Sequence, residues 1–226
     1  MNQDAQQQRT PTHARLREIA EQAARAAGAR ALRRFRRLPP PERKPDGSFV
    51  TVADREAERA AREVITGAFP DHQIVGEEFG SADARGPLHG PPPPSATPRW
   101  WIDPIDGTHN YLRGNHLFAS LVAVEAGPDI VAGAVYNPVL DEMLSAPRGG
   151  GCHCNGEPAT VSDIARLEDA QLVHGGFTWI EKHQQGKPFL DLTRRCWRTR
   201  GFGDYFGHVL VATGRADIML EPHVKP

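Results

Sequence analysis

Four acidic side chains stand at the ends of two strand-like segments of the sequence. The segment "RWWI" leads directly into Asp103 and Asp106, which only a Pro-Ile pair separates, and the segment "HQIVG" leads into Glu77 and Glu78. If these segments are neighbouring strands, their carboxyl ends share a crevice, where ligands of open sheets tend to bind. Carboxylates this close repel one another, so we expect a cation among them. Oxygen ligands without His or Cys favour Mg²⁺.

The residues around the second aspartate suggest what this cation would do. Gly107 and Thr108 follow Asp106, and a Gly-Thr pair at the start of a helix or turn offers backbone N–H groups to an anion. Pro104 restricts the backbone, so the carbonyl of Ile105 could also face the ion. A metal ion beside an anion site is the arrangement that phosphate-ester hydrolysis requires.

Each motif also has an ordinary structural interpretation. "IDG" is a common turn signal, and "GEE" can simply end a strand. Asp54 stands where a helix is expected to begin and is therefore a candidate N-cap as well as a candidate catalytic residue. Asp204 is likewise a candidate N-cap, at the start of a later helix, as well as a candidate substrate-binding residue. It is the combination of the motifs, in this order, that indicates chemistry.

The elements that would position these groups are a mixture of helices and strands. Apolar residues at three- and four-residue steps predict a first helix, which the proline-rich segment after it ends. Alternating and apolar runs between Gly, Pro and Asp residues predict a β meander in the middle of the chain. The expected helices are residues 16–35, 54–67, 187–198 and 204–214, and the expected strands are residues 49–54, 72–78, 99–102, 117–127, 130–138, 142–147, 170–176 and 215–222. This order indicates a layered α/β or α+β architecture. Residues 80–98 are expected to form a long surface loop.

The overall composition limits the class of protein. Among the 226 residues, 39% are hydrophobic and 24% are charged, and no apolar run approaches the ~18 residues of a membrane span. The polar N-terminus has no apolar stretch of the signal-peptide type. A net charge of −1 gives no general attraction to nucleic acid or membranes. We therefore expect a cytoplasmic protein that binds neither.

Two local features suggest alternatives. Cys152 and Cys154 form "CHC", half of a possible zinc site, but no second Cys/His cluster completes it, and an odd number of cysteines fits a reducing compartment. Ten arginines lie between Arg9 and Arg43. They are interpreted as the solvated face of the first helix. The alternative is an anion- or RNA-binding face, which would be sensitive to salt. No aromatic residues alternate with these arginines, which argues against nucleic acid.

The motifs "GEE", "WIDPIDGT", "VTVAD", "RGGGCHCNG" and "LVATGRADIMLE" resemble the inositol monophosphatase family of Mg²⁺-dependent phosphatases, from about residue 14 to residue 226. The resemblance implies an α+β fold, the layered αβαβα sandwich of the inositol monophosphatase and fructose-bisphosphatase type. It implies one phosphatase domain over residues 1–226, with subdomains at about 12–148 and 149–226, and a possible homodimer. A haloacid dehalogenase-type phosphatase would need D-x-D, whereas this motif is D-x-x-D.

The resemblance also implies roles for the site residues. One group of residues would bind two or more Mg²⁺ ions, another would orient the attacking water, and a third would hold the phosphate. The implied metal ligands are Glu77, Asp103, the Ile105 carbonyl and Asp106, the implied catalytic residues are Asp54, Thr108 and Glu77, and the implied phosphate ligands are Gly107 and Thr108.

The segment "RTRGFGDYFGHVLVATGRADIMLEP" is similar to the histidinol-phosphatase branch, which carries "RG-(F/Y)-GD" before the helix expected at residues 204–214. Histidinol phosphate has a cationic amine and an imidazole, and acidic groups at Asp204 and Glu221 would suit this cation. We therefore expect hydrolysis of L-histidinol phosphate, a step of histidine biosynthesis. Inositol 1-phosphate or another small phosphomonoester is the alternative substrate.

The sequence ends at "EPHVKP", about where family members continue with Trp-Asp and a further strand–helix–strand. We therefore expect the last strand–helix–strand to be missing and the second metal site to be weak. Two interpretations remain open. The chain is a fragment of a working enzyme, or it is an inactive homologue that binds phosphate ligands without hydrolysing them.

Overall fold

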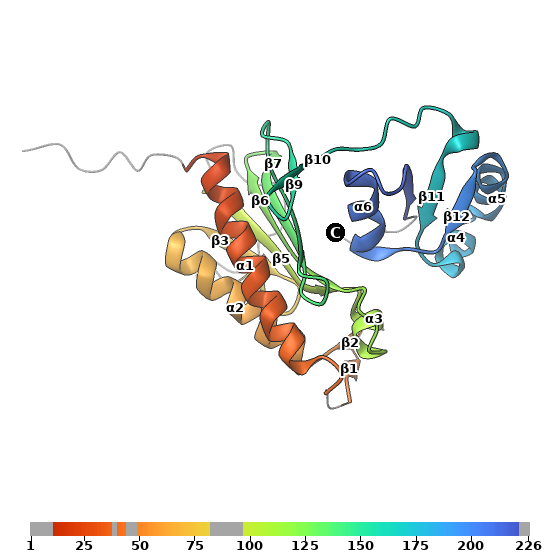
Figure 1. Cartoon of the computed structure of the whole chain (residues 1–226). Coiled ribbons are helices and arrows are strands. Elements are labelled where there is room, and N and C mark those ends of the chain that lie inside the picture. The colour runs from red at the N-terminus through yellow and green to blue at the C-terminus, as the bar shows by residue number, and fades with distance from the viewer. Residues whose placement is uncertain (1–10, 38–39, 44–48, 82–96, 222–226) are drawn as a thin grey trace, which may run out of the picture.

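Five layers of helices and sheets make up the part of the chain that the computed structural model describes, which is residues 11–37, 40–43, 49–81 and 97–221. Figure 1 shows these layers from left to right: α1 with α2, a large sheet, α6, a small sheet, and α4 with α5. The expected αβαβα sandwich is therefore confirmed. Among the described residues, no helix is long and apolar enough to cross a membrane.

The large sheet has eight strands in the order β10-β9-β8-β7-β6-β5-β3-β4. Its strands are β3 (Gln73–Gly76), β4 (Gly80–Ser81), β5 (Arg99–Asp106), β6 (Ala119–Ala126), β7 (Asp129–Asn137), β8 (Glu142–Pro147), β9 (Cys152–Cys154) and β10 (Glu157–Ala159). Strands β5 to β10 form an antiparallel meander, in which β6, β7 and β8 are the three strands that the sequence predicted as a meander. Strand β3 pairs with β5 in parallel. The β9–β10 hairpin continues this sheet to Ala159, beyond the subdomain boundary expected near residue 148.

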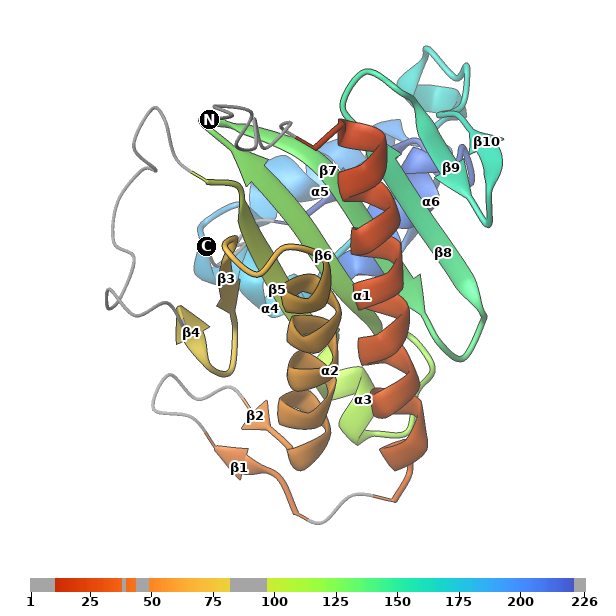
Figure 2. The ribbon, with the colours of Figure 1, turned by 90° about the vertical axis from the view of Figure 1, so that its left-hand side faces the viewer.

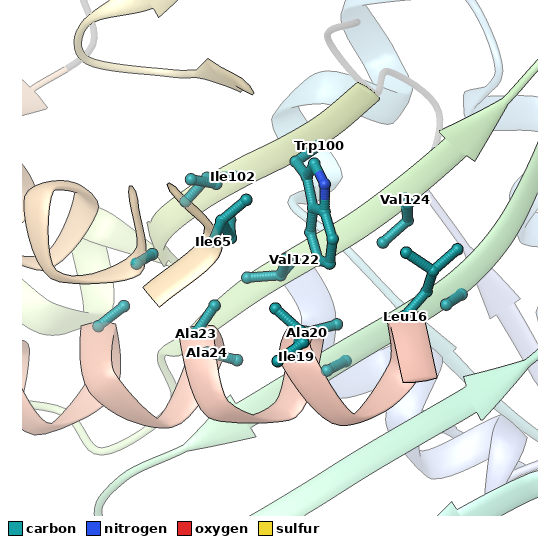
Figure 3. Packing of buried hydrophobic residues seen from close by; sticks show 14 of the residues in the cluster. Leu16, Ile19, Ala20, Ala23, Ala24, Ile65, Trp100, Ile102, Val122 and Val124 are labelled. Atoms are coloured by element: carbon teal, nitrogen blue, oxygen red, sulfur yellow. The ribbon is translucent and has the colours of Figure 1, made fainter. Parts of the chain in front are cut away.

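Helices α1 (His13–Arg34) and α2 (Val52–Ala68) lie side by side across one face of this sheet (Figure 2). Their apolar sides and the sheet enclose one continuous core, in which Leu16, Ile65 and Trp100 are almost completely buried (Figure 3). Burial of each such side chain stabilises the fold by about 1.5–3 kcal/mol. A short β1–β2 ribbon, Glu42–Arg43 with Phe49–Val50, joins the two helices.

The small sheet is parallel and has the order β12-β11-β13. Its strands are β11 (Gln171–His174), β12 (Arg198–Arg200) and β13 (Ile218–Leu220), and the helices beside it are α4 (Phe177–Lys182), α5 (Gly186–Arg195) and α6 (Asp204–Ala212). Helix α6 packs between the two sheets, since its residues belong to apolar clusters with both. A 3₁₀ turn, Leu167–Asp169, precedes β11.

Several sequence-based expectations need correction. Helix α2 begins at Val52 rather than Asp54, because Thr51 is its N-cap. The segments that form β4, β9, β10, β12 and α4 were not predicted, because they are short and lack a clear hydrophobic period. Most of the expected loop, residues 82–96, lies outside the described residues.

Candidate active site

The two strands that end in carboxylates are neighbours, as the sequence predicts. Strands β3 and β5 are parallel, and Gly76 pairs with Ile102. The backbone N–H of Glu77 then donates to the carbonyl of Ile102 at 3.1 Å. Glu77 and Asp103 therefore lie side by side, each one residue beyond the last pair of β3 with β5, although β5 itself continues to Asp106.

A β-bulge in β5 places the side chains of Asp103 and Asp106 on the same side of the strand. Residues three apart on a regular strand point to opposite faces. Here Asp103 pairs with Leu121 and Asp106 with Ala119, so β5 has one more residue than β6 in this interval. The extra residue restores the same side for both carboxylates. The backbone N–H of Ile105 donates to Asp103 Oδ1 at 3.1 Å and fixes the bulge.

Asp54 reaches the site from the first turn of α2. Thr51 Oγ1 accepts the backbone N–H of Asp54 at 3.4 Å, and Asp54 Oδ2 accepts the backbone N–H of Thr51 at 2.7 Å. This reciprocal capping box fixes the Asp54 carboxylate, which is 2% exposed. Burial raises its pKa, and the nearby charge of Glu77 adds to this effect. Asp54 is therefore a capping residue whose carboxylate also faces the site.

The "DGT" segment turns the chain at the end of β5. Gly107 has a φ of +80° and precedes the short helix α3 (Thr108–Leu112). A Cβ atom at Gly107 would also lie 2.8 Å from the carbonyl oxygen of Leu117, so a larger residue does not fit. The hydroxyl of Thr108 donates to the carbonyl of Ile105 at 3.0 Å. Thr108, which is predicted to orient the water, therefore contacts the Ile105 carbonyl, which is predicted to bind the metal.

The start of helix α6 brings the second half of the chain to the same carboxylates. The backbone N–H of Tyr205 donates to Asp106 Oδ2 at 2.6 Å, and Asn110 Nδ2 donates to Asp204 Oδ2 at 3.1 Å. Gly203, not Asp204, is the N-cap of α6, and Asp204 has a positive φ of 55°. A non-glycine residue is uncommon in this conformation. The capping interpretation of Asp204 is therefore wrong, and its carboxylate faces α3.

Glu221 follows β13 and points toward Gly175 and Gly203. Its Oε2 atom is buried and has no hydrogen-bond partner within the described part of the chain. A side chain at Gly175 would overlap the Glu221 carboxylate, so the two glycines leave room for it. Burial raises the pKa of Glu221, and a hydrogen bond to its carboxylate from the backbone N–H of Asp204 opposes this shift. The charge of the Asp204 carboxylate raises the pKa further, while His208 and His174 lower it.

The carboxylates influence one another strongly. Burial holds the pKa of Asp103 well above its usual range, and the charges of Asp106, Glu77 and Asp54 raise it further. Burial also raises the pKa of Asp106 to about 7, with Asp204 among the contributing charges, although the N–H of Tyr205 opposes the shift. All six predicted acidic residues, including Glu221, therefore belong to one electrostatic cluster.

The donor atoms of this cluster suit a hard cation. Carboxylate oxygens and a backbone carbonyl are the ligands that Mg²⁺ prefers, and a cation would relieve the repulsion that raises the pKa of Asp103. As the side chains stand, no group of three or more Asp, Glu, His or Cys residues among those described is close enough to enclose a metal ion. Mg²⁺ thus stays a prediction, and binding it requires the carboxylates to turn toward a common point.

Sequence reasoning missed Glu58, which supports the loop that carries Glu77. The Glu58 side chain is completely buried. Its Oε2 atom accepts the backbone N–H of Glu78 at 2.7 Å, and its Oε1 atom accepts Arg62 Nε at 2.7 Å. Arg62 Nη2 in turn donates to the carbonyl of Gly80 at 2.6 Å. One ion pair on α2 therefore holds the turn around Glu77.

Comparisons with known proteins agree with this arrangement. The sequence model of the inositol monophosphatase family matches residues 13–226. A histidinol-phosphatase from Streptomyces coelicolor is 36% identical, and the match covers 92% of this chain and 77% of the relative. An inositol-1-monophosphatase from Mesorhizobium japonicum is 35% identical over 65% of this chain and 51% of its own length. The solved structure of the extragenic suppressor protein SuhB from Bartonella henselae has a TM-score of 0.79 at 29% identity and covers 92% of this chain and 78% of its own.

Proposed function

Because this chain belongs to the inositol monophosphatase family, we propose that it is a Mg²⁺-dependent phosphatase whose substrate is L-histidinol phosphate. The relatives are phosphatases by name, so the class of reaction is hydrolysis of a phosphate monoester. The metal and the substrate are the parts of the proposal that need a test.

The observation that carries the substrate proposal is the unpaired carboxylate oxygen of Glu221. A buried carboxylate oxygen without a donor costs free energy, of the order of 1–3 kcal/mol or more. A substrate that brings an ammonium or imidazolium donor removes this cost, whereas a neutral polyol makes a weaker, uncharged hydrogen bond. Asp204 adds a second carboxylate beside it. Histidinol phosphate has such a cation, and inositol phosphate does not.

The proposed mechanism divides the work between the two strand ends and α2. Glu77, Asp103, Asp106 and the Ile105 carbonyl would hold the metal. When bound, Mg²⁺ would polarise the phosphate and increase the acidity of a water molecule.

The remaining residues would orient the reactants. Thr108 and the Asp54 carboxylate would orient the attacking water through hydrogen bonds. The backbone N–H groups of Gly107 and Thr108 would hold the phosphate at the start of α3. The capping box supports this assignment, because it gives Asp54 a single, fixed orientation.

Inositol 1-phosphate is the second candidate substrate. The inositol-1-monophosphatase relative supports it, and the residues of the carboxylate cluster that face the phosphate do not distinguish the two substrates. The residues that would distinguish the two substrates are Asp204 and Glu221, because they would contact the leaving alcohol rather than the phosphate.

The test is phosphate release from L-histidinol phosphate and from inositol 1-phosphate in parallel, with Mg²⁺ and with EDTA. We expect release that depends on Mg²⁺ and a kcat/KM at least about tenfold higher for histidinol phosphate, the gain from one charge-assisted contact. An equal or higher kcat/KM for inositol 1-phosphate would overturn the substrate proposal. Full release in EDTA would overturn the metal proposal. Binding of both substrates without release would favour the inactive-homologue interpretation.

A further inference from the structure

A second concave surface lies on the outer side of the helical layer, away from the sheet. The end of α1 and the middle of α2 form a groove of about 540 Å³. Figure 2 shows the two helices side by side on this face of the molecule. The groove is lined by Arg30, Arg33, Arg34, Arg37, Arg59, Glu56, Glu63 and Ala60. Its lining therefore carries a formal excess of three positive charges.

Within the described part of the chain, one of the five arginines in this arginine groove, Arg34, is held by an ion pair. Arg34 donates through Nε and Nη2 to both carboxylate oxygens of Glu56, at 3.1 and 2.7 Å. Among the described residues, no hydrogen bond or ion pair joins the exposed guanidinium groups of Arg30, Arg33 and Arg37 to a partner. The groove therefore has one fixed arginine and several guanidinium groups that can turn toward a ligand.

The arginine groove is separate from the carboxylate cluster. Asp54 is buried on the side of α2 that faces the sheet, whereas Glu56 lines the groove. Residues two apart on a helix point about 200° apart, so these side chains lie on opposite sides of α2. A ligand in the groove therefore does not occupy the crevice in which a phosphate monoester would be hydrolysed.

Helix stability explains only part of this charge. Arginines in the last turn of a helix interact favourably with its dipole, which accounts for Arg33 and Arg34. Arg37 lies beyond the end of α1, and Arg59 lies in the first half of α2, where a positive charge gains nothing from the helix dipole. Hydrogen bonding to Arg34 and the charges of Arg30 and Arg59 lower the pKa of Glu56, so this carboxylate offsets part of the repulsion among the arginines. The excess of three positive charges that remains in the lining is left for an anion to neutralise.

The shape and the chemistry of the lining restrict the anion. Guanidinium groups bind phosphate oxygens in pairs, and a groove of this volume is in the usual range for small ligands, about 300–1,000 Å³. No aromatic side chain is among the lining residues, so bases have nothing on which to stack. We propose that the arginine groove binds a compact polyphosphate group, such as a pyrophosphate or triphosphate chain, at a site distinct from the active site.

The test uses inorganic tripolyphosphate as the probe and isothermal titration calorimetry of the full chain in EDTA. Without metal, the carboxylate cluster repels a polyanion, so the heat reports on the groove. We expect binding that weakens as salt increases. The variant Arg30→Gln/Arg33→Gln/Arg37→Gln should bind on the order of 100-fold more weakly, since each substitution removes hydrogen bonds between charged groups.

The matched control is Arg15→Gln/Arg25→Gln/Arg148→Gln, which removes the same charge from exposed arginines outside the groove. We expect the dissociation constant of this control for tripolyphosphate to stay within about threefold of the wild-type value, because exposed charges outside the groove contribute little to binding. Both triple variants should hydrolyse the phosphatase substrate at the wild-type rate. Equal loss of binding in the two variants, or no binding by the wild type, would overturn the proposal. Tighter binding of single-stranded RNA than of tripolyphosphate at equal phosphate concentration would also overturn it, in favour of a nucleic-acid surface.

Discussion

The region of the large sheet, residues 13–159, and the region of the small sheet, residues 167–221, differ in how much core supports them. The first has one continuous core between two long helices and the sheet, with Trp100 at its centre. The second has two small apolar clusters, one on each face of three short strands. Its large side chains Phe177, Trp179 and Trp197 are exposed. The first region is therefore expected to be the more stable one.

This difference matches a division of roles within the carboxylate cluster. Asp54, Glu77, Asp103 and Asp106, with proposed roles toward metal and water, come from the region with the larger core. Asp204 and Glu221, with proposed roles toward the alcohol part of the substrate, come from the other. A rigid scaffold suits chemistry that depends on accurate distances, and a separate module can vary for substrate choice.

The largest effect is expected for Asp103→Asn, which should abolish the chemistry and leave both regions folded. Loss of a shared metal ligand removes several kcal/mol of transition-state stabilisation, so phosphate release should fall by about 10³-fold or more. The measurement is kcat at saturating Mg²⁺. Without Mg²⁺ the thermal midpoint should not fall, because one of several repelling carboxylates is removed. Activity within tenfold of the wild type would show that Asp103 is not a metal ligand.

The second prediction compares the stability of the two cores through the variants Ile65→Ala and Ile180→Ala. Both side chains are 0% exposed, and each truncation should cost about 2–5 kcal/mol of unfolding free energy. Hydrogen exchange should accelerate throughout the large sheet in the Ile65 variant. In the Ile180 variant it should accelerate in α4, α5 and β11 while β6 stays protected. Equal acceleration in β6 for both variants would mean that the two regions unfold as one unit.

Glu58→Gln tests whether the first region positions its proposed metal ligands through buried ion pairs. The substitution removes the charge that pairs with Arg62 and loosens the turn around Glu77. The Mg²⁺ concentration for half-maximal activity should rise about 10–100-fold, as for other outer partners of metal ligands. The control is Glu63→Gln, an exposed position on the same helix. A lower thermal midpoint with an unchanged Mg²⁺ requirement would leave Glu58 with a structural role only.

The smallest effect is expected for Glu221→Gln in the second region. It should lower kcat/KM for histidinol phosphate about tenfold through loss of a charged contact, and for inositol 1-phosphate less than threefold. Asp191→Asn, an exposed carboxylate on α5, is the control. An equal decrease for both substrates would place Glu221 in the chemistry rather than in substrate choice, and would break the division between the two regions.

Much of the fold followed from local sequence, because apolar runs between Gly, Pro and Asp residues mark the strands of the meander clearly. Family membership, predicted from "GEE" and "DPIDGT", is confirmed. Strand β12 was missed because "RTR" has no apolar pattern and is a strand only through its pairing with β11. Local sequence does not encode such a pairing.

The sequence proposed a candidate site by residue type, and the roles of its residues stay predictions; its geometry was not predicted. Sequence does not give the β-bulge between Asp103 and Asp106, since the register depends on β6. Two signals were present and overlooked. "TVAD" from Thr51 to Asp54 follows the spacing of a capping box. Glu58 lies among the alanines of a buried helix face, where a carboxylate requires a partner.

The capping box links the formation of the first turn of α2 to the orientation of the Asp54 side chain. The first turn of α2 and the orientation of Asp54 depend on the same pair of reciprocal hydrogen bonds with Thr51. During refolding, a chain with an unformed α2 start has no fixed carboxylate at this position, however complete the large sheet is. If Asp54 orients the water as proposed, activity would return only after this turn has closed. Nucleation of α2, the unfavourable step of helix formation, would then be a step toward the active enzyme.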